Sequence, residues 1–474
     1  MSVRMVADAP LAPRTTMQVG GAAKRLVVTE TERDLIDAVR ANPRAFLLGG
    51  GSNVVVADRG VDEAIVIATR GIERRSDADR MLVTAAAGEV WDDFVAAAVA
   101  EGLSGIECLS GIPGLVGSTP IQNVGAYGQE VKDTIASVRA WDVSRHETVV
   151  FAPADCRFRY RDSVFKSEMA GRFVVLSVTF ALRAAPPEPP RYKELVDALA
   201  SRDVPTTAAS LRETVVALRR KKGMVLDPAD PDTRSAGSFF TNPIVDAPAL
   251  ATVRERLGDQ AATMPVFPGG EGKTKLAAGW LIERAGFRKC HRLGRARLSS
   301  KHALAIVADE GATAADVVAL AREIQRGVRD RFAVTLAPEP IFVGFEAPPL
   351  ALFRRETPPQ PRHDVGDVLV VELALERRHD ARPLEDRLLD LLVGELRDAL
   401  REVGPLDAAG SVAAVAFVAV HVRLHVPVEE ELTALADPSL GHARLVAADR
   451  DERQDADDRE AAHAFPAASS TSLA

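Results

Sequence analysis

A glycine-rich segment at residues 111–128 restricts what this chain can fold into more than any other feature. It reads GIPGLVGSTPIQNVGAYG, with five glycines, two prolines and no charged residue in eighteen positions. This composition excludes an ordinary helix, because each glycine allows positive φ angles or a close approach of the backbone to a ligand. Long loops of this kind are usually functional. The neutral side chains of the segment suit an uncharged ring system that carries a phosphate tail.

A second glycine cluster, Gly49-Gly50-Gly51-Ser52-Asn53, follows the apolar run 45–48. A strand that runs into a glycine-rich turn brings backbone N–H groups to a pyrophosphate. We therefore expect one dinucleotide between the two clusters, although a plain turn is the alternative reading of the shorter one. The Rossmann spacing G-x-G-x-x-G is absent, and Glu73 lies in a charged run instead of at a strand end. A dinucleotide bound here implies a different fold.

Composition places the chain among soluble globular proteins. It is 47% hydrophobic and 27% charged, and its 67 acidic and 59 basic residues give a net charge of −8, which does not favour nucleic acid as a partner. We expect no secretory signal, because residues 1–13 contain no apolar h-region, and no membrane insertion, because no apolar run is long enough to span a bilayer. Cys108, Cys156 and Cys290 are too scattered for a disulfide framework or a zinc site. A cytoplasmic location is expected.

Periodicity predicts an alternation of short strands and helices. Strands are expected at 27–29, 45–48, 54–57, 64–67, 81–86, 135–143, 148–151 and 173–182. Helices are expected at 30–41, 89–101, 207–222, 275–286 and 312–331. Residues 1–25 are expected to be irregular, and the proline-rich stretch 186–190 is expected to be a linker.

The composition changes sharply after residue 346. The rest of the chain has no Lys, Asn, Ile, Met, Tyr, Trp or Cys and holds six of the nine histidines. One interpretation of this segment is a metal site at His421 and His425, which are spaced i, i+4. The alternative interpretation is an adventitious extension that was read from a GC-rich reading frame. A strand at 368–375 and a helix at 384–403 are possible, and residues 447–474 are expected to be disordered.

Six ordered motifs between about residues 12 and 345 resemble the UDP-N-acetylenolpyruvoylglucosamine reductase family (MurB), type I. They are LLGGGSNVVV (47–56), GIPGLVGSTPIQNVGAYGQEV (111–131), CRFRYRDSVFK (156–166), SAGSFFTNP (235–243), KLAAGWLIERAGF (275–287) and LAPEPIFVG (336–344). The resemblance implies an α+β fold, with an FAD-binding module of the vanillyl-alcohol-oxidase (PCMH) type and a C-terminal α+β substrate-binding domain. The implied boundaries are 1–188 for the FAD-binding domain, 189–346 for the substrate-binding domain and 347–474 for an extension of unknown role.

The resemblance also implies the activity. Members of the family use NADPH to reduce a non-covalently bound FAD, which then reduces UDP-N-acetylglucosamine enolpyruvate to UDP-N-acetylmuramate in peptidoglycan biosynthesis. The expected partners are therefore this substrate and NADPH, and a monomer is expected. Two alternatives stay open: a flavin oxidase of the same fold that uses O₂, and a protein whose tail mediates interactions.

Three residues match the catalytic positions of the family. Arg161 would stabilise the negative charge that hydride addition places on the carboxylate side, and its plain alternative is a surface ion pair with Asp162 or Glu168. Ser238 would donate the proton to C2, and its alternative is a turn serine. Glu339, between two prolines, would assist Arg161, and its alternative is a surface glutamate in a terminal turn.

The remaining matches concern binding. The cofactor is expected to contact Gly49, Gly50, Gly51, Ser52, Asn53, Gly111, Gly114, Gly117, Ser118, Thr119, Asn123, Gly125, Ala126 and Tyr127. The UDP-sugar is expected to contact Tyr192, Asn242, Lys275 and His302, with Lys275 as the phosphate cation or else as a solvated lysine at a helix start. No metal ligand is expected. Ala337, Phe267 and Asp309 depart from the common family residues, which puts the substrate affinity in doubt but not the reaction.

Overall fold

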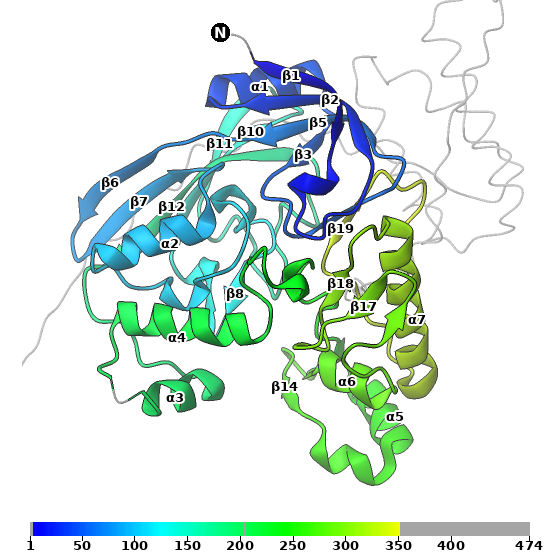
Figure 1. Ribbon diagram of the computed structural model, residues 1–474. Coiled ribbons are helices and arrows are strands. Elements are labelled where there is room, and N and C mark those ends of the chain that lie inside the picture. The colour runs from blue at the N-terminus through cyan, green and yellow to red at the C-terminus, as the bar shows by residue number, and fades with distance from the viewer. Residues whose placement is uncertain (1–2, 203, 351–474) are drawn as a thin grey trace, which may run out of the picture. The chain divides into compact units, whose positions relative to one another are not determined.

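The structure, a computed structural model, describes residues 3–202 and 204–350. Its first sheet has four strands in the order β1-β2-β5-β3, drawn in blue in Figure 1. The strands are β1 (Arg4–Pro10), β2 (Ala22–Thr29), β5 (Val61–Ile67) and β3 (Phe46–Leu48). β1 is antiparallel to β2, whereas β5 is parallel to both β2 and β3. The predicted first glycine cluster therefore follows directly from β3.

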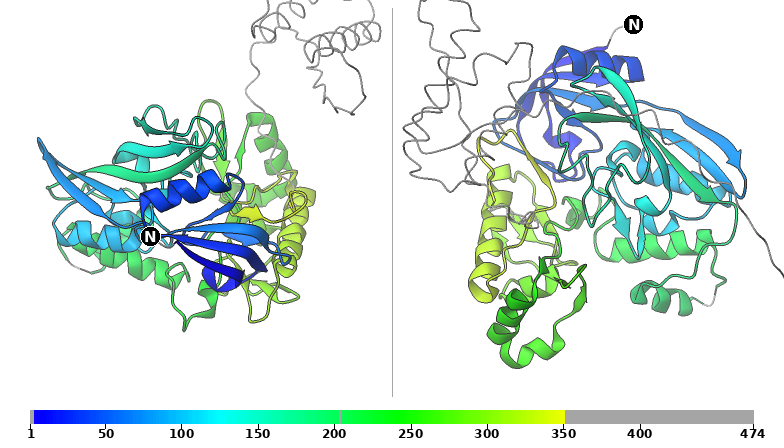
Figure 2. Two further views of the ribbon diagram at one scale, coloured as in Figure 1. Left: turned by 90° about the horizontal axis from the view of Figure 1, so that it is seen from above. Right: turned by 180° about the vertical axis from the view of Figure 1, so that it is seen from behind.

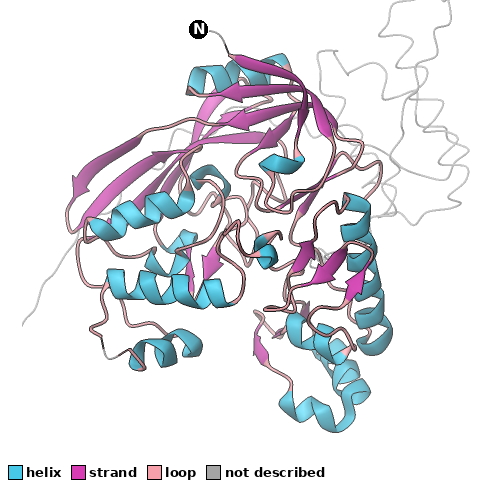
Figure 3. Ribbon diagram, viewed as in Figure 1, coloured by secondary structure: helices cyan, strands magenta, loops and turns pink. Residues whose placement is uncertain are grey.

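The second sheet has five antiparallel strands in the order β11-β10-β12-β7-β6. They are β6 (Ile72–Asp77), β7 (Arg80–Ala86), β10 (Ile135–Asp142), β11 (Glu147–Phe151) and β12 (Phe173–Arg183). Buried and partly exposed residues alternate along the central strand β12, as expected for a sheet whose two faces differ in burial. Figure 3 shows its long strands side by side, with α1 (Glu32–Ala41) above them and α2 (Trp91–Ala100) below.

Two amphipathic helices cover these sheets. Helix α1 (Glu32–Ala41) begins at the Thr31 cap and buries Leu35 and Val39 against residues of both sheets, which makes one core between them. Helix α2 (Trp91–Ala100) buries an aromatic group, in which Trp91 lies 5.7 Å from Phe180 between ring centroids. Burial of these side chains contributes roughly 1.5–3 kcal/mol each.

Helices α3 (Lys193–Ala200) and α4 (Ala208–Lys221) follow the proline-rich linker. They form a small core with Cys108, which lies in the 3₁₀ turn Glu107–Leu109 just before the long glycine-rich segment. Figure 1 shows α4 close to β8 (Gly125–Ala126), in the same segment; β8 pairs with β9 (Gln129–Glu130). The chain from 193 to 221 thus packs on the expected cofactor module, and the expected boundary at residue 188 stays a prediction.

The C-terminal elements surround a separate large core. Two three-stranded sheets contain β13 (Ile244–Val245), β15 (Thr274–Leu276) and β14 (Val266–Pro268), and β16 (Arg292–Leu293), β17 (Ala296–Leu298) and β18 (Ile306–Ala308). Their helices are α5 (Ala247–Leu257), α6 (Ala278–Arg284) and α7 (Ala314–Phe332). Helix α7 starts with a capping box between Thr313 and Asp316 and buries nine side chains along one face. Figure 2 shows these elements in green to yellow as a group of their own.

One short strand joins this group to the first. β19 (Ile341–Val343) pairs in parallel with β4 (Val54–Val56), which directly follows the cluster 49–53. The C-terminal core also contains Met17, Val19 and Val55 from the N-terminal part of the chain. The two groups are therefore held together beside the first glycine cluster.

Most expected helices and strands are confirmed, with ends that move by at most three residues, except that β2 begins five residues before the expected start at 27. The expectation that residues 1–25 are irregular is wrong, because they contain β1 and the first part of β2. The helix expected to start at Lys275 starts at Ala278, since Lys275 belongs to β15. The edge strand β6 was not predicted. The strand expected at 368–375, the helix expected at 384–403, the disorder expected at 447–474, and His421 and His425 all lie outside the described residues.

None of the helices in the described part of the chain is long and apolar enough to cross a membrane.

Candidate active site

The two glycine clusters lie in direct contact. A Cβ atom added to Gly50 would come within 2.7 Å of the Gly114 Cα, and one added to Gly114 would come within 3.1 Å of the Ser52 hydroxyl. That hydroxyl donates a hydrogen bond to the Pro113 carbonyl at 3.0 Å. Only glycine at these positions lets the two backbones approach so closely. Segments about 60 residues apart in the sequence therefore form one cradle, as expected for two loops that hold one dinucleotide.

The first cluster also contacts the C-terminal segment. The Asn53 amide donates hydrogen bonds to the Gln122 side chain at 2.8 Å and to the Glu339 carbonyl at 3.3 Å. The Asn53 carbonyl accepts a hydrogen bond from the Ile341 N–H at 3.0 Å. Asn53 thus links both glycine clusters to Glu339, the acidic residue that is expected to assist Arg161.

Several expected cofactor positions are packed into the protein. Gly117 leaves no room for a Cβ, which would lie 2.5 Å from the Ala87 methyl carbon. The buried Thr119 hydroxyl donates to the Val116 carbonyl, and the Asn123 side chain is fully buried and hydrogen-bonds Glu130. Thr119 and Asn123 therefore shape the loop through their side chains. Their contact with a cofactor stays a prediction.

Arg161 occupies a strained position in a tight turn. Its φ angle is +54°, in the left-handed region that non-glycine residues rarely adopt. The turn is closed by paired backbone hydrogen bonds between Arg159 and Asp162, and the Ser163 hydroxyl anchors it to the Ile121 carbonyl at 2.6 Å. Strain of this kind persists only where the surroundings hold it, and it concentrates at functional sites.

The Arg161 guanidinium contacts the cofactor loop and Glu339 together. Its Nη2 donates to the Gly125 carbonyl at 2.7 Å, and its Nε lies 3.3 Å from the Glu339 carboxylate. The side chains keep 24% and 15% of their exposure, so the pair is shielded but still reachable. The surface pairing with Asp162 or Glu168 is not formed, because both acids pair with Arg159.

Backbone pairing brings Ser238 next to Glu339. The Glu339 N–H donates to the Phe239 carbonyl at 2.9 Å, and the Thr241 N–H donates to the Ala337 carbonyl at 3.0 Å. Gly237, with φ of +72°, turns the chain before Ser238. Within the described residues the partly exposed Ser238 hydroxyl has no hydrogen-bond partner. The hydroxyl is therefore available to a ligand.

Tyr160 connects Arg161 to two of the expected substrate residues. The Lys275 ammonium lies 4.6 Å from the centre of the Tyr160 ring, a cation–π distance. Burial raises the pKa of Tyr160, while Arg161 and hydrogen bonds from Asn242 act the other way. The Asn242 side chain also accepts a hydrogen bond from the Ala278 N–H at the start of α6. Lys275 is thus a strand residue beside Tyr160 and not a solvated lysine at a helix start.

The other expected substrate residues gather at the end of α4. The Tyr127 and Tyr192 rings meet edge to face at 5.4 Å, and the Lys222 ammonium lies 5.6 Å from the Tyr127 ring centre. Burial, followed by the positive charges of Lys222 and Lys289, lowers the pKa of His302 to about 4. His302 is therefore neutral at pH 7 and can offer one N–H and one lone pair.

Sequence reasoning missed four further residues. Asp92 on α2 accepts a hydrogen bond from the Gly111 N–H at 2.6 Å and is paired through both oxygens with Arg212 on α4. Arg219 lies under Gly111, and Tyr160 lies between Arg161 and Lys275. No signal in the sequence links the basic end of α4 to the glycine-rich segment.

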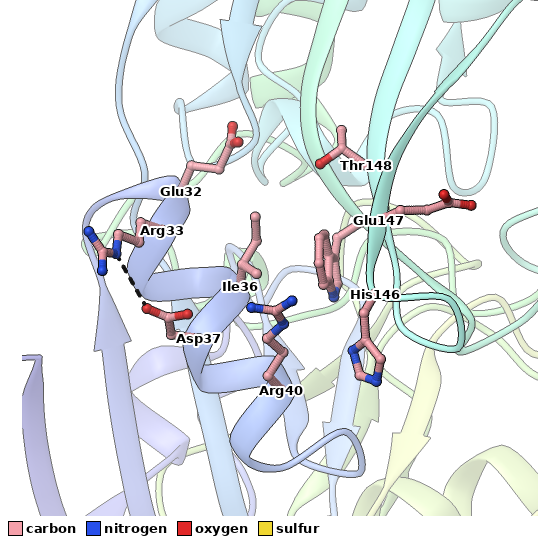
Figure 4. Close-up of a pocket in the computed structure, with 9 residues that line it drawn as sticks. Glu32, Arg33, Ile36, Asp37, Arg40, His146, Glu147 and Thr148 are labelled. Carbon is pink, nitrogen blue, oxygen red and sulfur yellow. Dashed lines mark ion pairs between the residues drawn. The ribbon is translucent and has the colours of Figure 1, made fainter.

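A separate hollow of about 570 Å³ lies between α1 and the β10–β11 hairpin and contains none of the expected site residues. Figure 4 shows Arg40 and His146 among the residues that line it, and the Arg40 guanidinium lies 4.9 Å from the centre of the Trp141 ring. Neighbouring charges there pair with one another, as Arg33 does with Asp37. This hollow is not part of the glycine-rich site.

The fold and the comparisons with known proteins give the class of this protein, an FAD-dependent reductase. A family model described as an FAD binding domain matches residues 23–150, and one described as the C-terminal domain of UDP-N-acetylenolpyruvoylglucosamine reductase matches residues 228–343. The expected α+β class, with an FAD-binding module followed by a C-terminal domain, is confirmed.

Similar proteins carry the same name as the C-terminal model. UDP-N-acetylenolpyruvoylglucosamine reductase from Streptomyces avermitilis is 50% identical over 358 residues, which cover 73% of this chain and 96% of that protein. The one from Mycobacterium marinum is 48% identical over 361 residues, covering 72% and 96%. The crystal structure of MurB from Thermus caldophilus is similar at 26% identity and a TM-score of 0.48, over 72% of this chain and 99% of that one. The chain belongs to the UDP-N-acetylenolpyruvoylglucosamine reductase family.

Proposed function

We infer that the protein is an FAD-dependent UDP-N-acetylmuramate dehydrogenase that takes reducing equivalents from NADPH. Its reaction converts UDP-N-acetylglucosamine enolpyruvate to UDP-N-acetylmuramate in peptidoglycan biosynthesis. Family membership supports the reaction, since relatives about half identical to this chain carry the reductase name. The observation that best supports these residues as the site is the shielded Arg161–Glu339 pair against the cofactor loop.

The chemistry of the cradle supports FAD as its ligand. The contact between Gly50 and Gly114 brings together two loops rich in backbone N–H groups and small side chains, which are the groups that bind a pyrophosphate. Gly49, Gly50, Ser52, Asn53, Gly114 and Ser118 would hold the cofactor. When bound, FAD supplies the hydride that NADPH has delivered to it. No histidine lies in either glycine cluster, in agreement with a non-covalent cofactor.

Arg161 would stabilise the charge that develops in the substrate. Hydride addition to C3 of the enolpyruvyl group leaves an electron pair on C2 that delocalises into the carboxylate. A planar guanidinium, already fixed by Gly125 and Glu339, can receive that carboxylate without reorganising. Glu339 fixes the orientation of Arg161 and balances its charge before substrate binds. Such preorganised electrostatics is usually the largest catalytic contribution.

Ser238 would complete the reaction by giving its hydroxyl proton to C2. A serine is a weak acid, so it needs a strongly basic acceptor and close placement. Its position one residue before Phe239, whose carbonyl is hydrogen-bonded to the Glu339 N–H, keeps it near the acidic residue. Two electrons and one proton arrive as hydride, the second proton comes from Ser238, and the C2=C3 double bond becomes single.

Lys275 and Asn242 would bind the diphosphate and sugar, and Tyr192 and His302 would extend the same site. Lys275 and Asn242 flank Tyr160, directly beside Arg161. Tyr192 and His302 lie near Lys222, a second cation suited to a phosphate. A neutral His302 can hydrogen-bond to a phosphate or a sugar hydroxyl without adding charge.

We propose that the protein works in the cytoplasm as a monomer and that its domains follow the boundaries 1–188 and 189–346. The three unpaired cysteines suit a reducing compartment. Light scattering of the purified full chain would test the oligomeric state. A stable dimer would contradict this part of the proposal.

The activity is tested by following the visible flavin absorbance of the full chain under anaerobic conditions. NADPH should bleach the absorbance, and UDP-N-acetylglucosamine enolpyruvate should restore it without oxygen. A flavin that is restored only by O₂, with release of peroxide, would instead favour the oxidase alternative. A protein that cannot be loaded with FAD would contradict the proposed function.

A further inference from the structure

The connection between β1 and β2 contacts both the first glycine cluster and the loop that contains Ser238. Its middle residue, Thr16, is half-buried and makes two hydrogen bonds to distant parts of the chain. The Thr16 N–H donates to the Gly51 carbonyl at 3.0 Å, and the Thr16 hydroxyl donates to the Ser235 carbonyl at 2.6 Å. One residue therefore joins the cradle to the chain three residues before the expected proton donor.

Close packing holds both ends of this bridge. A Cβ added to Gly51 would overlap the Arg14 carbonyl oxygen, so the glycine cluster lies directly against the connection. At the other end, the residues that follow the two hydrogen-bonded ones, Met17 and Ala236, belong to the same hydrophobic core. Packed surroundings transmit a displacement at one end of a bridge to the other, because they leave little room for local relaxation.

The turn from Ser235 to Ser238 is fixed at its two flanks. Inside the turn, Gly237 has a φ angle of +72°, and an added Cβ would come no closer than 4.0 Å to any non-adjacent group of the described chain. The later flank, Phe239, is held by backbone hydrogen bonds of 2.7 Å and 2.9 Å. The hydroxyl of Thr16 holds the earlier flank. The placement of the Ser238 side chain therefore depends on the Thr16 bond.

We propose that Thr16 is a positioning residue of the reaction, which sets the distance between the flavin cradle and the Ser238 hydroxyl. The inference rests on the proposed function. In that reaction a hydride reaches C3 from the flavin and a proton reaches the adjacent C2 from Ser238, so both donors must lie correctly about one substrate bond. A misplacement of about 1 Å in such an arrangement can cost roughly 10²-fold in rate. Thr16 acts through Ser238 and does not touch the reacting atoms.

The test compares Thr16→Val with Thr15→Val in the full chain. Both substitutions replace a hydroxyl by a methyl group of similar shape. The Thr15 hydroxyl donates to the Ala12 carbonyl, at 3.2 Å, inside the same connection, so its variant keeps the link to Ser235. In the FAD-loaded proteins, reduction by NADPH and reoxidation by UDP-N-acetylglucosamine enolpyruvate are measured separately, and reoxidation is measured in H₂O and in D₂O. The affinity for FAD is measured by titration of the apoproteins.

Thr16→Val should slow reoxidation roughly tenfold or more and leave reduction within twofold of the wild type, because reduction by NADPH does not use Ser238. The solvent isotope effect on reoxidation should rise, since proton transfer becomes more rate-limiting. The FAD affinity should stay within threefold, because the backbone bond to Gly51 is kept. Thr16→Ser should restore the rate of reoxidation, and Thr15→Val should change neither half-reaction by more than twofold. If Thr16→Val does not retain FAD, Thr16→Ala provides the same test, because it removes the hydroxyl without placing a methyl group against the Ser235 carbonyl.

A double-mutant cycle shows whether Thr16 acts through Ser238. In the Ser238→Ala background, Thr16→Val should slow reoxidation by less than twofold, since the group that it positions is already absent. Losses that multiply in the double variant would overturn the proposal. An unchanged reoxidation rate in FAD-loaded Thr16→Val, or an equal slowing of both half-reactions, would also overturn it.

Failure of the proposed function has a different signature. In that case the wild-type flavin accepts electrons from a reducing dye but does not pass them to UDP-N-acetylglucosamine enolpyruvate, and every variant behaves in the same way.

Discussion

The contact between the two glycine clusters makes Gly50→Ala the most informative single-methyl change in the molecule. The φ angle of Gly50 is not positive, so alanine there is not strained by its own backbone. The new Cβ would nevertheless lie 2.7 Å from the Gly114 Cα and 3.2 Å from the Gly114 carbonyl carbon. Backbone atoms on both sides cannot rotate away as a flexible side chain can. The loops must therefore separate.

The cost of this separation should appear mainly as weaker FAD binding. Inserting a methyl group into a packed contact typically costs about 1–3 kcal/mol. The apoprotein can relieve that strain by opening the cradle, whereas the FAD complex must keep both loops against the ligand. The full cost then falls on binding, and 1–3 kcal/mol corresponds to a roughly 5- to 150-fold higher Kd.

The neighbouring Gly49 provides a matched control. A Cβ at Gly49 would lie 3.4 Å from the Ser118 hydroxyl and 3.7 Å from a Leu115 methyl, both at the ends of side chains. Both variants are measured by FAD titration and by urea unfolding. Gly49→Ala should keep nearly wild-type stability of the apoprotein. The loss of FAD affinity should be larger in Gly50→Ala than in Gly49→Ala. Wild-type FAD affinity in Gly50→Ala, or a larger loss in Gly49→Ala, would refute the closed cradle.

Two further changes probe the charges of the site. In stopped-flow measurements, Glu339→Gln should slow the reoxidation of reduced FAD by substrate roughly 10²-fold or more and leave the reduction of FAD by NADPH unchanged. The control, Glu168→Gln, changes an acid that is paired with Arg159 and should alter neither rate. The pKa of His302 is about 4 in the folded protein and 6.5 ordinarily. As the pH falls between these values, His302 therefore binds a proton in the unfolded chain but not in the folded chain. Its contribution should destabilise the fold progressively from pH 6.5 to 4, by up to about 3 kcal/mol, and His302→Asn should flatten that part of the unfolding curve. Identical pH slopes for the variant and the wild type would contradict this assignment.

The strength of a local signal decides how much of the fold the sequence predicts. Helix α7 was predicted because a Thr313 cap precedes a long amphipathic stretch. Strand β1 was missed because most of its residues are exposed and the strand with which it pairs, β2, lies beyond a turn of more than ten residues. Strand β6 was missed because it is a charged edge strand, the kind that discourages aggregation and carries no apolar alternation.

Long-range contacts decide how much of the site the sequence predicts. The closeness of two glycine clusters could be inferred, because their chemistry demands one shared ligand. The pairing of Arg161 with Glu339 joins residues 178 positions apart, and only the resemblance to a family suggested that both belong to one site. Lys275 was assigned to a helix because its pairing with Ile244 and Phe267 in β15 is invisible to local periodicity.

The role of Ser238 as proton donor is tested most directly by measuring the two half-reactions of Ser238→Ala separately in an anaerobic stopped-flow instrument. Reduction of FAD by NADPH should stay within twofold of the wild type, while reoxidation by UDP-N-acetylglucosamine enolpyruvate should fall roughly 10²-fold or more. Ser235→Ala, a buried serine of the same loop, should lose less than tenfold in either step. Equal losses in both half-reactions of Ser238→Ala, or unimpaired reoxidation, would contradict the proposed mechanism.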